Sequence, residues 1–432
     1  MRTHLRSLAI AALALTVGGQ ALAQSTLPAL NSRPGAAYTL YLNFTGFNYS
    51  GTWAGKTPGS VPAFSTDADT SQFSTADVSA IREAWARTAQ KYTAFNINVT
   101  TIDPAVAAGQ ASTFDSRKAF YNQTPRMMQT IIGGSNTWYG ANAGGVSYVG
   151  VAAYSYGPTS QSHTNWVFPN NLGRSAKSVA EAAAHEDGHA LGLNHQTDQS
   201  SGADYSSNGG ASGPGSYAPT MGVGYSSQRS VWRIGAQNDV LRILENPGMG
   251  SLIGSTFGQS RATATPLPLT GSSVNFNLAS GIIVPINRGS NGPLGVDNYT
   301  ADFFSFSTLG GALSLTVNEG TQFLSAGTAD PGTTLDSTLQ IFDALGNTVG
   351  TGLADATTLK KTFSGSLTAG SYFARVGSRG GYTSTREPNA PYFTMGSYFL
   401  TGSGFNAVPE PATLAAIGLG LAMLGKRRRR RA

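Results

Sequence analysis

Three of the five histidines in this 432-residue chain lie in one short stretch, AAAHEDGHALGLNHQ, at residues 182–196. The alanine-rich run favours a helix. On such a helix His185 and His189 are four residues apart, so their side chains project from the same face. Two neutral imidazoles in this arrangement can both bind one tetrahedral Zn²⁺ ion at about 2.0–2.1 Å. A single pair of this kind is often accidental, so the neighbouring residues decide the interpretation.

These neighbours supply the remaining parts of a catalytic metal site. Glu186 is offset around the helix from His185, so it can act as a general base on a metal-activated water instead of binding the metal. Gly192 stands where the helix should end, because glycine adopts the left-handed conformation at little cost. The chain can then turn back and bring in His195 as a third ligand. Three protein ligands leave one coordination position open, which is typical of a catalytic Zn²⁺ site.

The string HEDGHALGLNH matches the pattern HExxHxxGxxH, and in this stretch the chain resembles the metzincin family of zinc endopeptidases. Metzincins place a methionine turn beneath the zinc, and the resemblance assigns that role to Met221 in the segment YAPTMGVGY. A core methionine beside a glycine-rich loop is the alternative interpretation. Some metzincins carry a tyrosine two residues after the methionine that stabilises the transition state. Val223 occupies that position here, and Tyr225 is the candidate for the role.

The elements that must position these residues alternate between strand and helix. Tyr38–Phe44 alternates like a strand, Ser74–Asp77 resembles the start of a helix, and Phe95–Val99 alternates again. This order predicts a first domain of the α+β or α/β class over residues 24–250. The metzincin resemblance implies a zincin-type catalytic domain, in which a mixed sheet carries the active-site helix.

Two more segments of this domain bear directly on the site. The zinc helix can be capped by Ser175 or by Ser178, the latter through a capping box with Glu181. The alternating segment Gly144–Gly150 is a candidate for the sheet edge that pairs with an extended substrate. An ordinary internal strand is the alternative for that segment.

Residues 255–406 change in character to short strands separated by Gly, Ser and Thr, which predicts an all-β sandwich domain. The expected strands include Phe303–Phe306, Leu313–Val317, Leu339–Phe342 and Tyr372–Val376. The pattern over residues 302–376 resembles the bacterial pre-peptidase C-terminal domain, a family that accompanies secreted peptidases. The boundary between the two domains is expected near residues 246–251.

Both ends of the chain read as processing signals. Residues 1–23 have a basic start, an apolar stretch and the cleavage site Ala21-Leu22-Ala23, as in a secretory signal peptide. Residues 408–432 join Pro409-Glu410-Pro411 to an apolar run, 412–425, and six cations. This tail resembles the PEP-CTERM sorting signal of certain Gram-negative bacteria. The resemblance implies export through the inner membrane, transient anchoring by a transmembrane segment, and cleavage by an exosortase-type enzyme, which leaves the protein at the cell surface or outside the cell.

The overall charge of +6 comes from the two ends of the chain. Two arginines lie in the leader, and five arginines and one lysine, offset by Glu410, lie in the tail. The remaining body carries a net charge of −1, so no basic groove for nucleic acid is expected. The chain has no cysteine, so it has neither disulfide bonds nor thiolate ligands.

The expected function is that of a zinc metalloendopeptidase with a protein or peptide substrate. Two alternatives stay open: a catalytically inactive surface or matrix adhesion protein, and a zinc hydrolase acting on a glycan or an ester. His163, in a polar segment, is interpreted as a surface residue. Asp198 and Asp204, in a Gly/Ser-rich loop, are candidates for a structural Ca²⁺ site.

Overall fold

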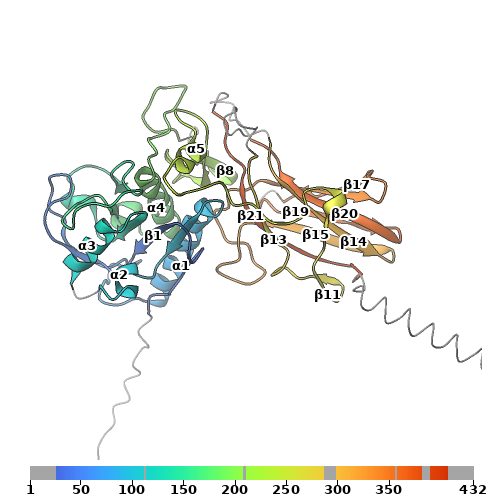
Figure 1. Cartoon of the computed structure of the whole chain (residues 1–432), viewed down its shortest axis with the longest axis horizontal. Helices are drawn as coiled ribbons and strands as arrows, with labels where there is room; N and C mark the ends of the chain where they lie inside the picture. Colours follow the sequence, from blue (N-terminus) through green and yellow to red (C-terminus); the bar gives the residue numbers. More distant parts are fainter. Residues whose placement is uncertain are drawn as a thin grey trace, which may run out of the picture.

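The computed structural model describes residues 26–110, 113–207, 211–286, 298–355, 358–381 and 390–406. The predicted signal peptide and sorting tail lie outside these residues. Figure 1 shows a mixed α/β region, which carries the N-terminal part of the chain, beside a mostly β region. The predicted order, a mixed region followed by a region built mostly of β-strands, is therefore confirmed.

Within the ranges that the structure describes, no helix has both the length and the apolar character needed to cross a membrane.

The N-terminal region is built on a five-stranded sheet in the order β4-β1-β5-β7-β6. The strands are β1 (Tyr38–Asn43), β4 (Ile97–Thr100), β5 (Met127–Ile132), β6 (Gly145–Val146) and β7 (Thr164–Val167). Four of them run parallel, and β6 pairs antiparallel with β7 at one edge. The strand predicted at 38–44 is confirmed. The second predicted strand begins at Ile97 rather than Phe95, because the turn after the preceding helix extends to residue 96.

Two long helices, α1 (Thr75–Tyr92) and α4 (Ala176–Ala190), pack together over this sheet. The helix start predicted at Ser74–Asp77 is confirmed as a capping box: the Ser74 hydroxyl accepts from the Asp77 amide, and the Asp77 carboxylate accepts from the Ser74 amide. Ser175 is the N-cap of α4, without a side-chain hydrogen bond. The predicted capping box of Ser178 and Glu181 is wrong, because Glu181 is buried against other partners described below.

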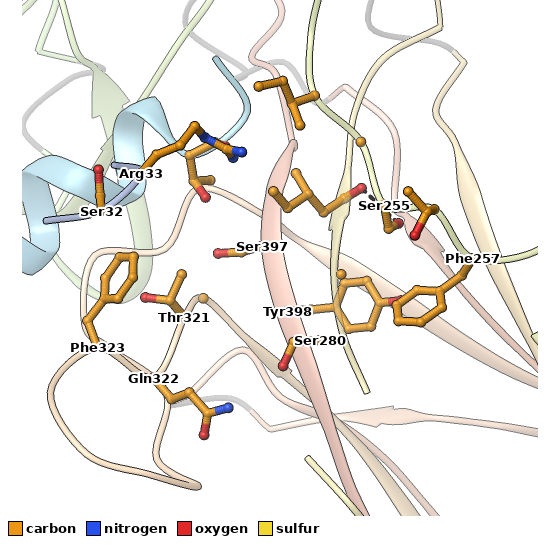
Figure 2. A pocket seen from close by; sticks show the side chains of 17 residues that line it. Ser32, Arg33, Ser255, Phe257, Ser280, Thr321, Gln322, Phe323, Ser397 and Tyr398 are labelled. Atoms are coloured by element: carbon orange, nitrogen blue, oxygen red, sulfur yellow. Dashed lines mark hydrogen bonds between the residues drawn. The ribbon is translucent and has the colours of Figure 1, made fainter. Parts of the chain in front are cut away.

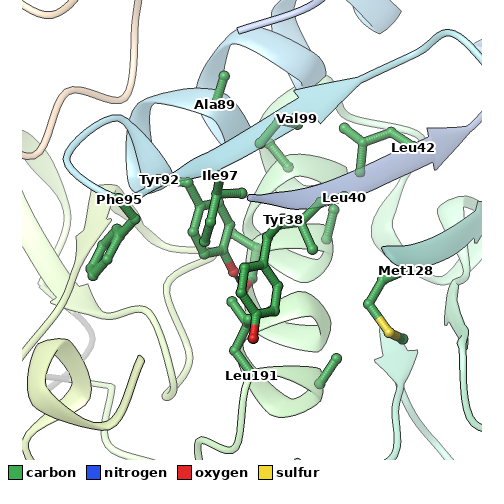
Figure 3. Close-up of a cluster of buried hydrophobic side chains, with 14 of the residues drawn as sticks. Tyr38, Leu40, Leu42, Ala89, Tyr92, Phe95, Ile97, Val99, Met128 and Leu191 are labelled. Carbon is green, nitrogen blue, oxygen red and sulfur yellow. Dashed lines mark hydrogen bonds between the residues drawn. The ribbon is translucent and has the colours of Figure 1, made fainter. Parts of the chain in front are cut away.

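The first core lies between the sheet and these two helices. Alternate residues of β1 point to opposite faces: Leu40 and Leu42 belong to the core under α1 and α4, and Figure 3 shows them beside Val99 and Tyr92. Tyr41 faces the other side, where it joins an aromatic cluster that includes Trp166. A sheet buried on both faces makes a rigid support for whatever α4 carries.

Shorter elements complete the N-terminal region. They are α2 (Pro104–Ala107), α3 (Phe114–Gln123), the hairpin of β2 (Phe47–Tyr49) and β3 (Gly59–Val61), the parallel pair β8 (Gly213–Pro219) and β9 (Ser227–Val231), α5 (Asp239–Leu244), and short 3-10 turns at Asn136–Trp138 and Pro169–Leu172. The turn between β8 and β9 carries the methionine predicted to lie under the zinc.

The C-terminal region consists of two packed sheets. One has the order β10-β14-β20-β16-β17, with β10 (Thr265–Pro266), β14 (Ala301–Thr308), β16 (Ser337–Asp343), β17 (Thr348–Thr351) and β20 (Gly370–Ser378). The other contains β11 (Leu269–Thr270), β12 (Ser273–Val274), β13 (Ser280–Ile283), β15 (Gly311–Glu319), β18 (Leu353–Ala354), β19 (Lys361–Leu367) and β21 (Gly396–Ser403). Alternate residues of β14 are buried, as a sandwich requires. The four predicted strands lie within β14, β15, β16 and β20.

The two regions are joined through side chains of the first core. Phe393 and Met395, which precede β21, belong to the same buried cluster as α1 and α4. The Phe393 amide donates to the Trp232 carbonyl at 2.8 Å, and the Phe323 ring lies 4.8 Å from the Trp85 ring. A cavity of about 510 Å³ remains between the regions, and Figure 2 shows Arg33 on one side of it. The sandwich therefore contributes to the core under helix α4.

One buried carboxyl group of the sandwich gives a prediction on stability. Glu319 is 2% exposed and accepts hydrogen bonds from Ser337 and Lys361. Burial raises its pKa to about 7, against about 4.3 in an unfolded chain. A raised pKa means that the group favours folding at low pH, and that this contribution is lost as the pH rises through about 7.

We therefore compare the free energy of unfolding of Glu319→Gln with that of wild type at two pH values. We expect this difference to shift by about 2 kcal/mol in favour of the variant between pH 4.5 and pH 8. Lys361 keeps Asp336 as a partner in this variant, at 3.1 Å. Urea unfolding at several pH values measures the difference. A difference that is independent of pH, or one that favours wild type at high pH, would contradict this account.

Candidate metal centre

Helix α4 brings the first two histidines together in the predicted way. His185 and His189 lie one turn apart, and their ring centroids are 4.7 Å from each other. The helix ends at Ala190, and Gly192 adopts a φ of +95°. Its amide donates to the His189 carbonyl at 2.8 Å. A side chain rarely adopts this conformation, so glycine at this position lets the chain turn back toward the helix.

The turn places His195 beside the other two rings. One nitrogen from each of His185, His189 and His195 can be chosen so that all three lie within 4.8 Å of one another. The Nε2 atoms of His189 and His195 are 3.0 Å apart. Two nitrogens bound to one tetrahedral zinc at about 2.0–2.1 Å would be roughly 3.4 Å apart. The three predicted ligands therefore gather at one point.

Backbone carbonyl groups orient two of these rings. Nδ1 of His185 lies 2.9 Å from the Thr220 carbonyl, and Nδ1 of His189 lies 2.7 Å from the Leu193 carbonyl. A carbonyl can only accept, so each Nδ1 carries the proton in the neutral ring, and each Nε2 keeps its lone pair. This is the usual arrangement for histidines that bind a metal through Nε2.

The surroundings keep the three rings uncharged. Burial lowers the pKa of His185 well below its usual value and the pKa of His189 to about 4. Burial also lowers the pKa of His195, and nearby Asp204 partly opposes this shift. Neutral imidazoles are the form that binds metal ions, so the site is prepared for a cation near neutral pH.

Glu186 lies in the cleft beside the rings. Glu186 is 6% exposed, and it lines a cavity of about 390 Å³ together with His185, Gly145 of the edge strand β6 and the preceding residue Gly144. A Cβ atom at Gly145 would lie 2.7 Å from the Glu186 Oε1 atom. Burial raises the pKa of Glu186 well above its usual value, with a smaller contribution from Asp187. The carboxyl group and the open edge of the sheet thus share one cavity.

Asp187 anchors helix α4 to the sheet. Its carboxylate is fully buried and accepts from the Thr130 hydroxyl on β5 at 2.6 Å and from the Asn165 amide on β7 at 3.0 Å. Burial raises the pKa of Asp187 to about 7. Because Asp187 sits between Glu186 and Gly188 on the helix, these bonds fix the rotation of α4 that aims both histidines at the cleft.

Met221 lies directly beneath the helix. It is fully buried, and a Cβ atom at Gly188 would lie 2.6 Å from its Sδ atom. The neighbouring Thr220 carbonyl orients His185, and the Met221 carbonyl accepts from the Gln196 amide at 2.7 Å. The turn between β8 and β9 therefore contacts the zinc helix and the chain around the third histidine.

A buried polar relay holds this turn against the helix. The Ser230 hydroxyl donates to Glu181 in a short contact, and the Thr220 hydroxyl donates to Ser230 at 3.2 Å. Lys91 of α1 lies 3.5 Å from the Glu181 carboxylate and donates to the Gly332 carbonyl of the sandwich at 3.3 Å. Glu181 is one turn before His185, so the relay connects the helix, the turn and the sandwich.

Two tyrosines reach the site, and sequence reasoning found one of them. Tyr225 lines the cavity, and a Cβ atom at Gly144 would lie 2.6 Å from its hydroxyl. The ring of Tyr205 lies 4.0 Å from the His195 ring and also lines the cavity. Burial raises the pKa of both phenols, with a smaller contribution from Glu186. Tyr205 follows the motif in a loop with no fixed spacing, so only its proximity to His195 in the sequence could have suggested it.

The interpretation of His163 as a surface residue is wrong. His163 is fully buried, with Nδ1 2.6 Å from the Tyr121 carbonyl and Nε2 3.1 Å from the Val151 carbonyl. Strand β7 begins at the next residue, which draws His163 into the sheet. It takes no part in the metal centre, since both ring nitrogens face backbone carbonyls.

The calcium hypothesis gains no support from the described residues. The Asp198 carboxylate accepts from the amides of Ser200 and Ser201, as in an Asx turn. In the part of the chain that the structure describes, the three histidines form the one group of potential metal ligands. Asp204 lies near His195, but among the described residues it forms no group of potential metal ligands with other carboxylates.

Comparison with known proteins bears on the C-terminal part of the chain. Residues 407–431 match the family model of the PEP-CTERM protein-sorting motif. The motif indicates export and sorting to the cell surface, and it implies processing by an exosortase. No curated protein matches the chain. Among solved structures, the chain is similar to the pre-peptidase C-terminal domain of a collagenase from Bacillus anthracis, with 13% identity over 29% of this chain and 87% of that domain, and a TM-score of 0.17. A similarity with so low a TM-score supports no conclusion about activity.

The contact between Gly188 and Met221 yields a first prediction on the site. Alanine favours a helix over glycine by about 1 kcal/mol, but the new methyl group would collide with a buried sulfur atom. We expect Gly188→Ala to destabilise the protein by about 1–3 kcal/mol and to weaken zinc binding. Chemical unfolding and zinc titration measure the two effects. Gly157→Ala, where no atom lies within 4 Å of the added group, is the control, and equal behaviour of both variants would refute the assigned contact.

The relay yields a second prediction. Ser230→Ala removes the hydroxyl that joins Glu181 to Thr220, so the carbonyl that orients His185 is held less firmly. We expect zinc affinity to fall by about 10-fold or more, measured by competition with a chromogenic chelator. The matched control is Ser227→Ala on the same strand, whose hydroxyl donates to the Ala211 carbonyl. Unchanged affinity in a folded Ser230→Ala variant would show that the relay does not orient His185.

Proposed function

We propose that the chain is a surface-sorted, zinc-dependent endopeptidase in which His185, His189 and His195 bind the metal and Glu186 is the general base. One observation carries this proposal: His185, one of three clustered histidines, shares a cavity with the buried Glu186 and with Gly145 at the edge of the sheet. The resemblance of HEDGHALGLNH to the metzincin motif gives the same assignment of roles.

The donor set fits zinc better than a hard cation. Three neutral nitrogens with their lone pairs converging suit Zn²⁺, whereas Ca²⁺ and Mg²⁺ prefer oxygen ligands. Two of the rings are already held by carbonyl groups at 2.9 and 2.7 Å. Three protein ligands leave room for a fourth, which is the usual composition of a catalytic site.

Bound zinc supplies Lewis acidity, which polarises a scissile carbonyl and makes a water molecule easier to deprotonate. The proposed role of Glu186 is to accept the proton of the attacking water and to pass it to the leaving amine. The position of Glu186 suits the role of general base, because its carboxyl group faces the cavity next to Gly145 and is offset from the ligand nitrogens. Asp187 and Met221 act by positioning, since Asp187 bonds α4 to the sheet and Met221 packs against Gly188 of the same helix.

The edge strand is the proposed binding site for the substrate backbone. Strand β6 pairs with β7 on one side, and in the described part of the chain no strand covers its other side. An extended peptide can add to such an edge through main-chain hydrogen bonds. A peptide bound there would cross the cavity in front of Glu186, which would place a peptide bond beside the metal.

Tyr225 is the proposed donor to the oxyanion that develops during hydrolysis. Its hydroxyl lies against Gly144, on the wall of the same cavity, and its raised pKa keeps it protonated as a donor. Tyr205 packs on the His195 ring and limits the movement of the third ligand.

Zinc content and casein hydrolysis test this function together. Glu186→Gln keeps the shape of the side chain, so we expect it to retain zinc while casein hydrolysis falls by about 10²–10⁴-fold. His189→Ala should lose zinc and activity together. Glu83→Gln changes a carboxylate on α1 that pairs with Arg87, and it should behave as wild type.

The other outcomes separate the alternatives. Zinc bound by wild type without cleavage of any member of a peptide library would favour the adhesion protein or a hydrolase of a glycan or ester. Equal cleavage by wild type and Glu186→Gln would refute the role of Glu186.

A further inference from the structure

The end of the sandwich farthest from helix α4 carries two neighbouring turns. One connects β14 to β15, which lie in different sheets, and the other closes the hairpin of β16 and β17. Leu309 lies in the turn between β14 and β15, and Leu345 lies in the turn between β16 and β17. Both β14 and β16 pair with β20, and their last residues pair with the first residues of that strand. The two turns therefore project from the same end of one sheet. Since one strand separates them, they stand about 10 Å apart.

These two leucines are unusually exposed. Leu309 is 84% exposed and Leu345 is 85% exposed, more than any other large hydrophobic side chain in the described residues. Around them the turns consist of Thr, Gly, Ala and Asn together with Asp343. The Asp343 carboxylate is occupied by the amides of Gly346 and Asn347. We call the turns 308–311 and 343–347 the leucine tip.

A positively charged side chain lies beside the leucine tip. The guanidinium group of Arg261 lies against Gly346, where an added Cβ atom would be 2.0 Å from it. The Asp343 carboxylate accepts only amide hydrogen bonds and keeps its negative charge, which Arg261 offsets, so this surface is close to neutral. Apolar side chains on a surface without net negative charge suit the interface of a lipid bilayer.

The chain leaves the sandwich at this same end. Asn406 forms a bridge with Ser307, two residues before Leu309, and its amide donates to the Ser307 carbonyl at 3.1 Å. Residues 407–411 then connect to the apolar run 412–425 and the basic cluster, within the matched sorting motif. Fully extended, this connection spans about 20 Å at most. In the uncleaved protein, the leucine tip is therefore held close to any membrane that contains the tail.

We propose that the leucine tip is a membrane-contacting surface that inserts Leu309 and Leu345 into the bilayer interface while the tail is in place. Two side chains alone give weak binding, but the tether makes the contact intramolecular and raises its effective concentration. Removal of the tail ends this advantage, so the same surface releases the processed protein.

This arrangement sets the height of the catalytic region above the membrane. Strand β15 begins at Gly311 in the leucine tip and ends at Glu319, next to the loop whose Thr321 bonds to Gln90 of α1. At about 3.4 Å per residue, the strand spans about 27 Å. The sandwich then acts as a spacer that holds the cleft away from the lipid on the outer side of the membrane that contains the tail.

The absence of cysteine allows a direct test on the full-length chain. Single variants Leu309→Cys and Leu345→Cys, each labelled with an environment-sensitive dye, are inserted through the tail into vesicles of phosphatidylethanolamine and phosphatidylglycerol containing brominated lipid. Leu353→Cys is the control, because Leu353 is 76% exposed but lies level with Thr316, about 17 Å from the leucine tip along β15. Zinc content checks that each variant is folded.

We expect lipid quenching at positions 309 and 345 to be several-fold stronger than at position 353. Introducing Leu345→Asn should weaken the quenching at position 309. Equal, weak quenching at all three positions would overturn the proposal. Shielding of the dye at 309 and 345 in protein without the tail and without lipid would also overturn it, because that result would identify a second copy of the chain as the partner.

Discussion

The convergence of three imidazole lone pairs is the constraint on which the rest of this structure depends. Such an arrangement needs uncharged rings in a buried place, and it needs the protons of the Nδ1 atoms to be bonded elsewhere. The Thr220 and Leu193 carbonyls meet the second need for His185 and His189. The first need is met by burial, which lowers the pKa of every ring in the trio. The helix, its glycine end and the methionine turn are arranged around these requirements.

The part of the site that could be predicted is the part that local spacing determines. A separation of four residues on a helix brings His185 and His189 to one face, and a glycine two residues from the helix end lets the chain return with His195. The Ser74 capping box and the alternating strands follow local rules as well. The order of the parallel strands and the side on which α4 packs depend on contacts distant in sequence, so the sequence could not supply them.

The predictions from sequence were wrong where contacts with buried partners outweighed the local preference of a residue. Glu181 has the spacing of a capping residue, yet Ser230 and Lys91 draw it into the interior. His163 stands in a polar segment, but the start of β7 carries it into the core, where two carbonyl groups meet its ring. Tyr205 reaches His195 through a loop whose path no spacing rule predicts. The sandwich, expected as a separate unit, also contributes Phe393 and Met395 to the core beneath the zinc helix.

The most direct test of the central claim is X-ray absorption at the zinc edge of the purified full-length protein after growth with ample zinc. The account predicts one zinc per chain with three nitrogen ligands at about 2.0–2.1 Å and one further light ligand, and the loss of this signature in His195→Ala. A protein that remains free of metal and has no affinity for added Zn²⁺, or one whose zinc is surrounded mainly by oxygen, would contradict the account.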